Sequence, residues 1–289
     1  MQRFLPPLRI HSWGGLGSQL FAVALAEDLK VTFPKRALRI VLHTGGVTRR
    51  LPEVVEIFPE YEYQYEEDFR PRSEASENIS SQSKFNLRKA LIRFLTLLGL
   101  LAYCNGDTST KKLSPWVLSI RGHYSYRSIS AKFLIRFAER CQSLNKTLIP
   151  DLNETCVTHY RLGDLLTITE KKPVSERAIA TEYFRIRNEM SFRKLVVFSD
   201  SPSEARERFL ALIEDEMLVM DSKTSLVIAN AIQTQYFIGT SSKISFWIAG
   251  IRAVVYQKRS SLPFKNVDQY RNLAGDQFGL ISTYVTHSL

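Results

Sequence analysis

Short apolar segments alternate with segments of helical periodicity along most of the chain, and this order restricts the fold more than any other feature. Near the start, Leu8–Ser12 has the pattern of a strand, a helical pattern follows from about Ser18, and Leu38–Leu42 has the pattern of a second strand. A strand, a helix and another strand in succession form the unit from which parallel sheets are built. The sequence therefore predicts an α/β fold.

The second half of the sequence repeats this alternation more regularly. Ser201-Pro202-Ser203-Glu204 is typical of a helix start, because it combines a capping box with proline at the first helical position. Strands that alternate with helices throughout predict doubly wound parallel sheets. The expected strands are 155–161, 194–198, 217–220, 236–239 and 253–256, and the expected helices are 131–141, 222–235, 242–251 and one from residue 202.

Two polar stretches interrupt this order. Residues 70–83 are polar and rich in serine, which predicts a mobile loop. Residues 143–154, which contain Pro150, are typical of a linker. A length of 289 residues suits one large domain or two of ordinary size, so we expect an N-terminal lobe over 1–150 and a C-terminal lobe over 151–289.

Composition and charge narrow the class of protein. A hydrophobic content of 44% with 24% charged residues is that of a globular protein. The net charge of +10 either favours a polyanionic partner or only keeps the protein soluble. Because the sequence contains no nucleic-acid-binding motif, we expect no nucleic acid partner. Three widely spaced cysteines without a C-x-x-C pair indicate a reducing compartment. The first predicted strand begins too early to leave room for a signal peptide, so we expect a cytoplasmic protein.

An apolar segment at Ala90–Tyr103 has two interpretations. It is too short to span a bilayer, which needs about 20 apolar residues, and Arg93 interrupts it. It is either a buried helix or a helix in the membrane interface, with Lys84, Arg88 and Lys89 on lipid phosphates. The second interpretation predicts peripheral membrane contact through residues 84–103.

Candidate ligand-binding residues follow the predicted strands. In open α/β sheets, ligands bind beyond the carboxyl ends of the strands, and polar sets lie there in four segments. These candidates are Gly14, Gly15, Gly17, Ser18, Gln19, His159, Arg161, Asp164, Ser199, Asp200, Thr240, Ser241, Ser242 and Lys243.

Two of these segments suggest specific chemistry. His159 and Arg161 alternate along a strand and share a face, where an arginine can hold a diphosphate through two parallel hydrogen bonds. Asp164 is placed to orient Arg161 or to accept from a ligand hydroxyl; alternatively, Arg161 and Asp164 form a structural ion pair beside a core histidine. The Gly14–Ser18 turn either receives an anion at its backbone N–H groups or serves only as a tight strand-to-helix turn.

The segment Thr240–Lys243 precedes an apolar helix. It either forms a second phosphate clamp or simply supplies the N-cap from Ser241 or Ser242. No D-x-D triplet follows a strand, so we expect no metal ion, with the charge of a leaving diphosphate neutralised by Arg161, Lys243 and helix N-termini. Asp164 and His11 are candidates for a general base because they stand at strand ends.

The same segments resemble the motifs of a known enzyme family. Gly14–Phe21 (GGLGSQLF) and His159–Asp164 (HYRLGD) resemble the G-G-L-G-N-Q-x-F and H-x-R-R-G-D motifs of the α-1,2-fucosyltransferases of bacterial O-antigen synthesis. Further segments in the same order are similar to motifs of that family, namely Gly122–Tyr124, Val197–Asp200 and Thr240–Trp247. The chain departs from the motifs at Ser18, at Leu162 and within residues 243–247.

This resemblance implies a GT-B fold of two Rossmann-like lobes, with the acceptor side in residues 1–150 and the nucleotide sugar bound by residues 151–289. It also implies inverting, metal-free transfer of fucose from GDP-fucose to a galactose-type hydroxyl of a surface-glycan precursor. Arg161 would hold the β-phosphate, and His159 would lie near the ribose or a phosphate. Ser199 and Asp200 would lie near the base, and Ser241 and Ser242 near the phosphates.

Three other functions stay open at the level of sequence. The first is the same fold with another nucleotide sugar, and the second is a non-catalytic sugar- or nucleotide-binding protein. The third is a basic adaptor at a membrane surface. The strand-end motifs favour an enzyme, because an adaptor needs no arrangement of Arg161 with Asp164. The resemblance implies that its acceptor is a glycan or a lipid-linked glycan.

Overall fold

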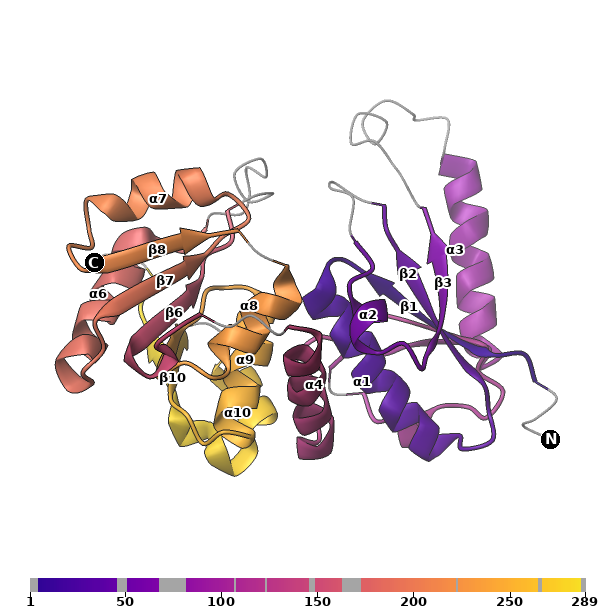
Figure 1. Ribbon diagram of the computed structural model, residues 1–289. Coiled ribbons are helices and arrows are strands. Elements are labelled where there is room, and N and C mark those ends of the chain that lie inside the picture. Colours follow the sequence, from indigo (N-terminus) through magenta and orange to yellow (C-terminus); the bar gives the residue numbers. More distant parts are fainter. Residues whose placement is uncertain are drawn as a thin grey trace. The chain divides into compact units, whose positions relative to one another are not determined.

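Parallel β-sheets form the centre of both halves of the chain in a computed structural model (Figure 1). The structure describes residues 5–45, 51–67, 82–106, 108–122, 124–145, 149–162, 173–221, 223–264 and 267–286. Two units are present, Met1–Ser128 and Ile129–Leu289. The division predicted at residue 150 lies beyond helix α4 (Ala131–Leu144), which packs against helices of the second unit.

The sheet of the first unit has the strand order β3-β2-β1-β5-β4, and all of its neighbouring strands are parallel. Its strands are β1 (Leu8–Trp13), β2 (Leu38–His43), β3 (Glu62–Glu66), β4 (Leu101–Tyr103) and β5 (Ser119–Arg121). The helices of this unit are α1 (Leu16–Thr32), α2 (Val54–Ile57), α3 (Gln82–Leu97) and the 3₁₀ turn η4 (Thr110–Lys112).

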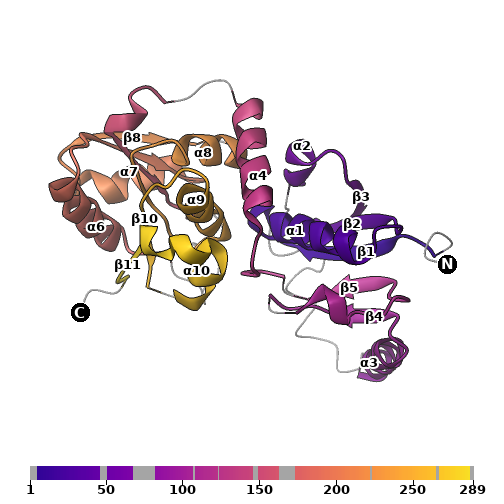
Figure 2. The same ribbon diagram turned by 90° about the horizontal axis from the view of Figure 1, so that it is seen from below.

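Helix α1 packs along β1 and β2 (Figure 2). The helix predicted from about Ser18 is confirmed, and its Leu20, Ala24 and Leu25 side chains are all buried. The turn before the helix depends on Gly14, whose φ of +102° is unfavourable for any residue with a Cβ atom. A Cβ atom at that position would also lie 3.0 Å from Ser18 Oγ.

The sheet of the second unit has the order β11-β10-β9-β6-β7-β8, again with all neighbouring strands parallel. Counted from β6, this is the 3-2-1-4-5-6 order of dinucleotide-binding folds. Its strands are β6 (Thr155–His159), β7 (Lys194–Phe198), β8 (Glu216–Met220), β9 (Tyr236–Ile238), β10 (Ser260–Pro263) and β11 (Ile281–Tyr284). Besides α4, its helical elements are η5 (Leu152–Glu154), α6 (Glu176–Glu189), α7 (Pro202–Leu210), α8 (Thr224–Ala231), α9 (Lys243–Val254), α10 (Val267–Ala274) and η6 (Gly275–Leu280).

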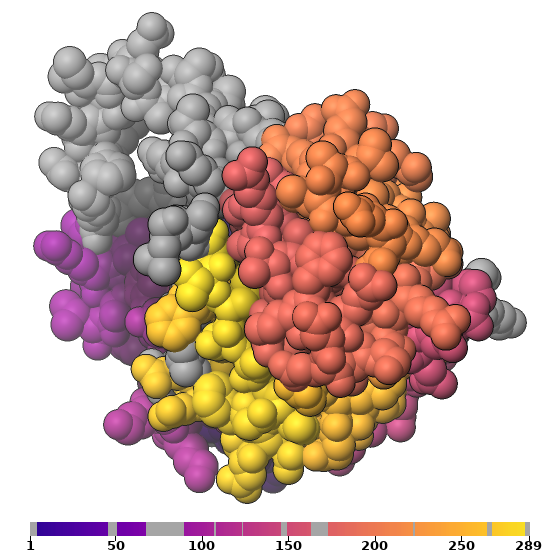
Figure 3. All heavy atoms as spheres, turned by 90° about the vertical axis from the view of Figure 1, so that its left-hand side faces the viewer, coloured from indigo at the N-terminus to yellow at the C-terminus, as the bar shows by residue number. Residues whose placement is uncertain are grey.

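The predicted fold class of two Rossmann-like α/β lobes with parallel sheets is therefore confirmed. Figure 3 shows one outer face of the second unit, where the surface of α6 (red) continues into that of α7 (orange) and of the C-terminal residues (yellow).

A buried arginine fixes the chain between α8 and β9. The Arg252 side chain is fully buried and donates to the carbonyl oxygens of Ala231 (2.6 Å), Thr234 (2.9 Å) and Gln235 (3.0 Å). Burial lowers the pKa of Arg252 to about 9. These bonds satisfy the carbonyl of the last helical residue and two carbonyls beyond it, and α8 ends at Ala231 and not at residue 235 as predicted.

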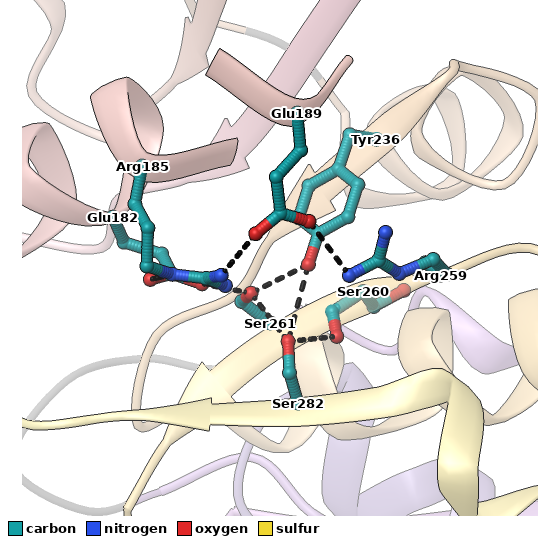
Figure 4. Close-up of polar contacts among 8 residues, drawn as sticks. All are labelled: Glu182, Arg185, Glu189, Tyr236, Arg259, Ser260, Ser261 and Ser282. Carbon is teal, nitrogen blue, oxygen red and sulfur yellow. Dashed lines mark hydrogen bonds and ion pairs between the residues drawn. The ribbon is translucent and has the colours of Figure 1, made fainter. Parts of the chain in front are cut away.

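A polar cluster lies at the amino-terminal edge of the same sheet, opposite to the strand ends where ligands are expected. The Tyr236 hydroxyl is hydrogen-bonded to the hydroxyls of Ser261 (2.7 Å) and Ser282 (3.1 Å) (Figure 4). The Ser261 hydroxyl also donates a hydrogen bond to the Glu182 carboxylate. These buried groups satisfy one another, so the cluster pins β9, β10 and β11 to α6. The complete set in Figure 4 is Glu182, Arg185, Glu189, Tyr236, Arg259, Ser260, Ser261 and Ser282.

Two predictions about apolar segments are wrong. The strand expected at 253–256 does not form, because α9 continues through Val254 and the next strand is β10. The segment Ala90–Tyr103 is not one buried helix: α3 ends at Leu97, β4 follows, and the Leu91, Phe94 and Leu97 side chains are exposed. A short apolar run has the same pattern in a buried helix and in a strand, so periodicity does not separate them.

Smaller differences concern caps and loops. Helix α7 starts at Pro202 as predicted, but the Ser201 side chain makes no capping bond; instead, Ser199 Oγ accepts from the Ser201 N–H group (3.1 Å). Of the predicted loop at 70–83, residues 70–81 lie outside the described residues and 82–83 begin α3.

Candidate functional site

The candidate residues of the second unit gather where the direction of strand succession reverses. Strand β6 is followed in sequence by β7 on one side, while β9 pairs with it on the other side. Such a reversal leaves a crevice outside the carboxyl ends of the two central strands, and ligands of open α/β sheets bind there. His159 ends β6, and Thr240 to Ser242 join β9 to α9.

Hydrogen bonds connect the two strand ends directly. Thr240 Oγ1 donates to the His159 carbonyl oxygen (2.9 Å), and His159 Nδ1 lies 3.3 Å from Ser242 Oγ. Behind them, Ser245 Oγ accepts from the Thr240 N–H group (2.9 Å). Ser245 is fully buried and was not predicted as a site residue, since it lies inside an apolar helix. The structure thus brings together three of the predicted residues, His159, Thr240 and Ser242.

The backbone at the end of β9 approaches its neighbours too closely for any side chain. A Cβ atom on Gly239 would lie 2.4 Å from Leu262 Cδ2 and 2.8 Å from Ser245 Cβ. Glycine is therefore required here, and it allows Thr240 to start the turn toward α9.

The third strand end joins the group through a carboxylate. Asp200, which follows β7, accepts from the Leu162 N–H group at Oδ1 (2.8 Å). Ser199 is buried and serves the turn into α7. Asp200 thereby holds the backbone that carries Arg161 in place.

From His159 to Leu162, buried and partly exposed residues alternate, as expected for a strand with two different faces. Tyr160 and Leu162 are fully buried in the hydrophobic core, whereas His159 and Arg161 are partly exposed. Leu162, where the chain departs from the H-x-R-R-G-D motif, therefore packs in the core. The family's second arginine thus corresponds here to a core position.

The electrostatic surroundings keep His159 uncharged at neutral pH. Burial of its ring by surrounding protein lowers its pKa to about 4; Asp200 opposes this shift, while the positive charge of Arg161 adds to it. A neutral imidazole both donates and accepts, which suits a residue placed against Ser242 and a ligand oxygen.

Helix α9 presents its N-terminus at this crevice. Ser242 is its N-cap and accepts from the Ser245 N–H group (3.0 Å), so the N-cap interpretation of this segment is confirmed. The helix dipole nevertheless concentrates partial positive charge there. Ser241 is exposed and Lys243 is partly exposed, and both stand at the same terminus. A cap and an anion-binding site are compatible at one helix end.

The remaining candidates of this segment, Gly163 and Asp164, lie outside the described residues. The role of Asp164 as catalytic carboxylate or as orienting partner of Arg161 stays a prediction.

In the first unit, the predicted turn lies at the carboxyl end of β1. Gly15 is the N-cap of α1 and accepts from the Ser18 N–H group at 2.9 Å. Gln19 is buried; its amide donates to the carbonyl oxygens of Gly14 (3.2 Å) and Leu51 (2.9 Å). Gln19 thus ties α1 to the chain before α2, while Gly17 stands in the first turn of the helix.

One further group of polar residues was missed at this edge. Within the part of the chain that the structure describes, His11, His43 and Glu66 form the one group of three His, Cys, Asp or Glu side chains whose potential ligand atoms lie within 4.8 Å of one another. His11 was noted from sequence as a strand-end residue. His43 and Glu66 carried a comparable signal, because they end β2 and β3.

Fold and site together define an α/β protein with two parallel-sheet units, the second of which has dinucleotide-binding strand order and a group of polar residues at its switch point. No protein-family model matches the sequence, and no curated relative matches it.

Solved structures with similar folds exist at low sequence identity. Escherichia coli heptosyltransferase WaaC with ADP-2-deoxy-2-fluoro heptose is 12% identical with a TM-score of 0.48, over 90% of this chain and 89% of that one. The glycosyl transferase family 9 protein of Veillonella parvula DSM 2008 is 12% identical with a TM-score of 0.48, over 98% and 88%. POFUT1 in complex with GDP is 11% identical with a TM-score of 0.41, over 89% and 98%. These values support no conclusion about activity, and the fold class rests on the two sheets described above.

Among the described residues, no helix combines the length and the apolar character needed to cross a membrane.

Proposed function

We propose that this protein is a glycosyltransferase that binds a nucleotide sugar in its second unit. The observation that carries the proposal is the convergence of His159, Thr240 and Ser242 at the switch point between β6 and β9, beside Arg161. This is the position at which sheets of this strand order bind nucleotides.

The charges at the crevice suit a diphosphate. Arg161 supplies a permanent cation, and Lys243 with the N-terminus of α9 supplies a second positive region. Because His159 stays neutral, it serves as a hydrogen-bonding group and adds no charge. In the proposed reaction, these groups neutralise the leaving diphosphate without a divalent metal ion, and Asp164 orients Arg161 or accepts from a ligand hydroxyl.

The proposed donor is GDP-fucose, transferred with inversion to a galactose-type hydroxyl of a surface-glycan precursor. The support is the resemblance of residues 14–21 and 159–164 to the α-1,2-fucosyltransferase motifs. On this proposal, Ser199 and Asp200 lie on the base side of the nucleotide, and Ser241 lies near a phosphate. Another nucleotide sugar is the second candidate, favoured by Leu162 in the core where the motif has arginine.

The proposed working place is the cytoplasm, on the inner face of the cell membrane. Helix α3 and the turn after it expose large apolar side chains: Leu91 by 55%, Phe94 by 56%, Leu97 by 86% and Leu98 by 52%. Such side chains beside a basic segment are typical of a peripheral membrane contact, which would bring the enzyme to a lipid-linked acceptor.

Calorimetric titration with GDP, UDP and ADP tests the nucleotide site. We expect GDP to bind most tightly and Arg161→Ala to weaken it about 10- to 100-fold, because one charge-assisted hydrogen bond contributes about 1.5–3 kcal/mol. Transfer from GDP-fucose should fall about 100- to 1,000-fold. The matched control is Arg193→Ala: Arg193 is exposed and precedes β7 at the opposite edge of the sheet.

Each outcome separates one part of the proposal from the rest. Unchanged GDP binding in the Arg161→Ala variant contradicts the site. Preferential binding of UDP or ADP contradicts fucose as the donor sugar but leaves a glycosyltransferase. Nucleotide binding without transfer to any glycan would indicate a non-catalytic binding protein.

A further inference from the structure

Three adjacent strands of the first unit place two imidazoles and one carboxylate together at their carboxyl ends. In the parallel register, Trp13 of β1 lies opposite His43 of β2, and His43 lies opposite Glu66 of β3. His11 stands two residues before Trp13, so His11, His43 and Glu66 project from the same face of the sheet.

The three side chains lie close together, with the His43 ring directed toward His11 through one nitrogen and toward Glu66 through the other. His11 Nδ1 lies 2.9 Å from His43 Nε2, and His43 Nδ1 lies 3.7 Å from Glu66 Oε2. One ligand atom from each residue can be chosen so that all three lie within 4.8 Å of one another. Two nitrogens bound to one ion at about 2.0–2.1 Å are separated by about 2.9–3.4 Å in octahedral or tetrahedral geometry. The His11–His43 distance of 2.9 Å is that of a hydrogen bond and lies at the octahedral end of this interval, so a tetrahedral ion would require the two nitrogens to separate by a few tenths of an ångström.

The surroundings orient the carboxylate toward the histidines. Arg9 Nη2 lies 2.5 Å from Glu66 Oε1, and Gln64 Nε2 donates to the same oxygen at 3.4 Å. Glu66 Oε2 is therefore the oxygen on the side of His43. Partners of this kind fix the orientation of ligating side chains in metal sites.

The histidines are also held and shielded from water. The Trp13 ring stacks on the His43 ring at 4.2 Å between centroids, and His11 and His43 are only 2% and 3% exposed. A dry, rigid surrounding strengthens coordination, because the ligands need little rearrangement.

We propose that His11, His43 and Glu66 bind one divalent transition-metal ion, with Zn²⁺ as the preferred metal. Imidazole nitrogen suits zinc, cobalt and nickel better than magnesium or calcium, which prefer oxygen ligands. Three protein ligands leave one tetrahedral position of a zinc ion for water or for a ligand hydroxyl. The site concerns the first unit alone and does not depend on the proposed nucleotide site. The proposed metal site differs from the expectation that the protein binds no metal ion, because that expectation rested only on the absence of paired carboxylates in the sequence.

The test is metal binding by the purified full-length chain after treatment with a chelator. Isothermal titration with Zn²⁺ should give one site per chain, and Co²⁺ should produce the visible absorption of a site with nitrogen ligands. His43→Asn and Glu66→Gln remove one ligand each. Since loss of a mere supporting partner weakens metal binding about 10- to 100-fold, loss of a ligand should weaken it about 100-fold or more.

The matched control is Glu62→Gln. Glu62 belongs to the same strand as Glu66 but pairs with Arg39 outside the cluster, so this variant should bind Zn²⁺ like the wild type. Because His43 is buried, the fold of its variant is checked by circular dichroism. If that variant unfolds, the partly exposed Glu66, replaced by a glutamine of the same shape, decides the question.

Two results would overturn the proposal. One is the absence of saturable Zn²⁺ or Co²⁺ binding by the wild type, which would mean that the histidines only hydrogen-bond each other. The other is wild-type affinity in Glu66→Gln together with folded His43→Asn, which would place the ion elsewhere.

Discussion

Replacing Leu162 by arginine would restore the second arginine of the H-x-R-R-G-D motif. The variant tests whether the side chain at position 162 faces the nucleotide site or the hydrophobic core. If the side chain at this position faced the crevice, the added cation would strengthen nucleotide binding. The structure instead places Leu162 in the hydrophobic core, fully buried together with Tyr160 and Phe209. We therefore expect Leu162→Arg to destabilise the second unit and to bring no gain in affinity for GDP.

The magnitude follows from burial. Losing a fully buried leucine side chain removes about 1.5–3 kcal/mol of hydrophobic stabilisation. A guanidinium group in the same place adds a desolvation cost of several kcal/mol unless it reaches water. The expected loss of unfolding free energy is about 4 kcal/mol or more, a large part of the about 5–15 kcal/mol typical of a native protein.

Urea unfolding followed by tryptophan fluorescence measures this loss, and calorimetry measures the affinity for GDP. Leu210→Arg is the matched control, because Leu210 ends α7 of the same unit and is 67% exposed. It should change stability by no more than about 0.5 kcal/mol. Wild-type stability of Leu162→Arg combined with tighter GDP binding would refute the core position.

Three further predictions concern the crevice and α3. GDP should bind with the same affinity, within about twofold, in millimolar Mg²⁺ and in EDTA, because cationic groups of the protein serve the diphosphate; a tenfold gain with Mg²⁺ would contradict this. The folded-state pKa of His159, about 4, lies below its ordinary value of 6.5, so the unfolded chain binds more protons between these values. The wild type should therefore lose stability relative to His159→Gln as the pH falls from 6.5 toward 4, and parallel pH profiles in denaturant unfolding would contradict the shift. Finally, vesicles with anionic lipid should co-sediment the wild type, and Phe94→Glu should weaken this binding; equal binding of both would exclude α3 as the contact.

The sequence was sufficient to predict strands that are short apolar runs ending in polar residues. Strands β1, β2, β6 and β7 were predicted within about two residues at their ends, and the rule on strand ends then indicated His159, Thr240 and Ser242 without any structure. The reason is physical: parallel strands buried on both faces have continuous apolar runs, so polar residues mark where they stop.

Periodicity failed where stability comes from contacts between distant residues. Strand β3 (EYQYE) has acidic residues at both ends and a weak strand pattern, but Glu62 pairs with Arg39, and Glu66 with Arg9 across the sheet. Such cross-strand pairs appear only once the register is known. Helix α9 ran past its predicted end for a related reason, since Arg252 near its C-terminus is held by carbonyl groups of the segment before β9.

The two sheets show why one topological rule can lead to different chemistry. Parallel strands bring polar residues together at their carboxyl edge in both units, but the identities of these residues differ. In the second unit the edge combines Arg161 with the N-terminus of α9, which favours an anion such as a diphosphate. In the first unit it combines His11, His43 and Glu66, which favours a cation with nitrogen ligands. The second set has no fixed spacing along the chain, because its members come from three strands and meet only through their register. A search of the sequence for paired carboxylates therefore had no means of finding it.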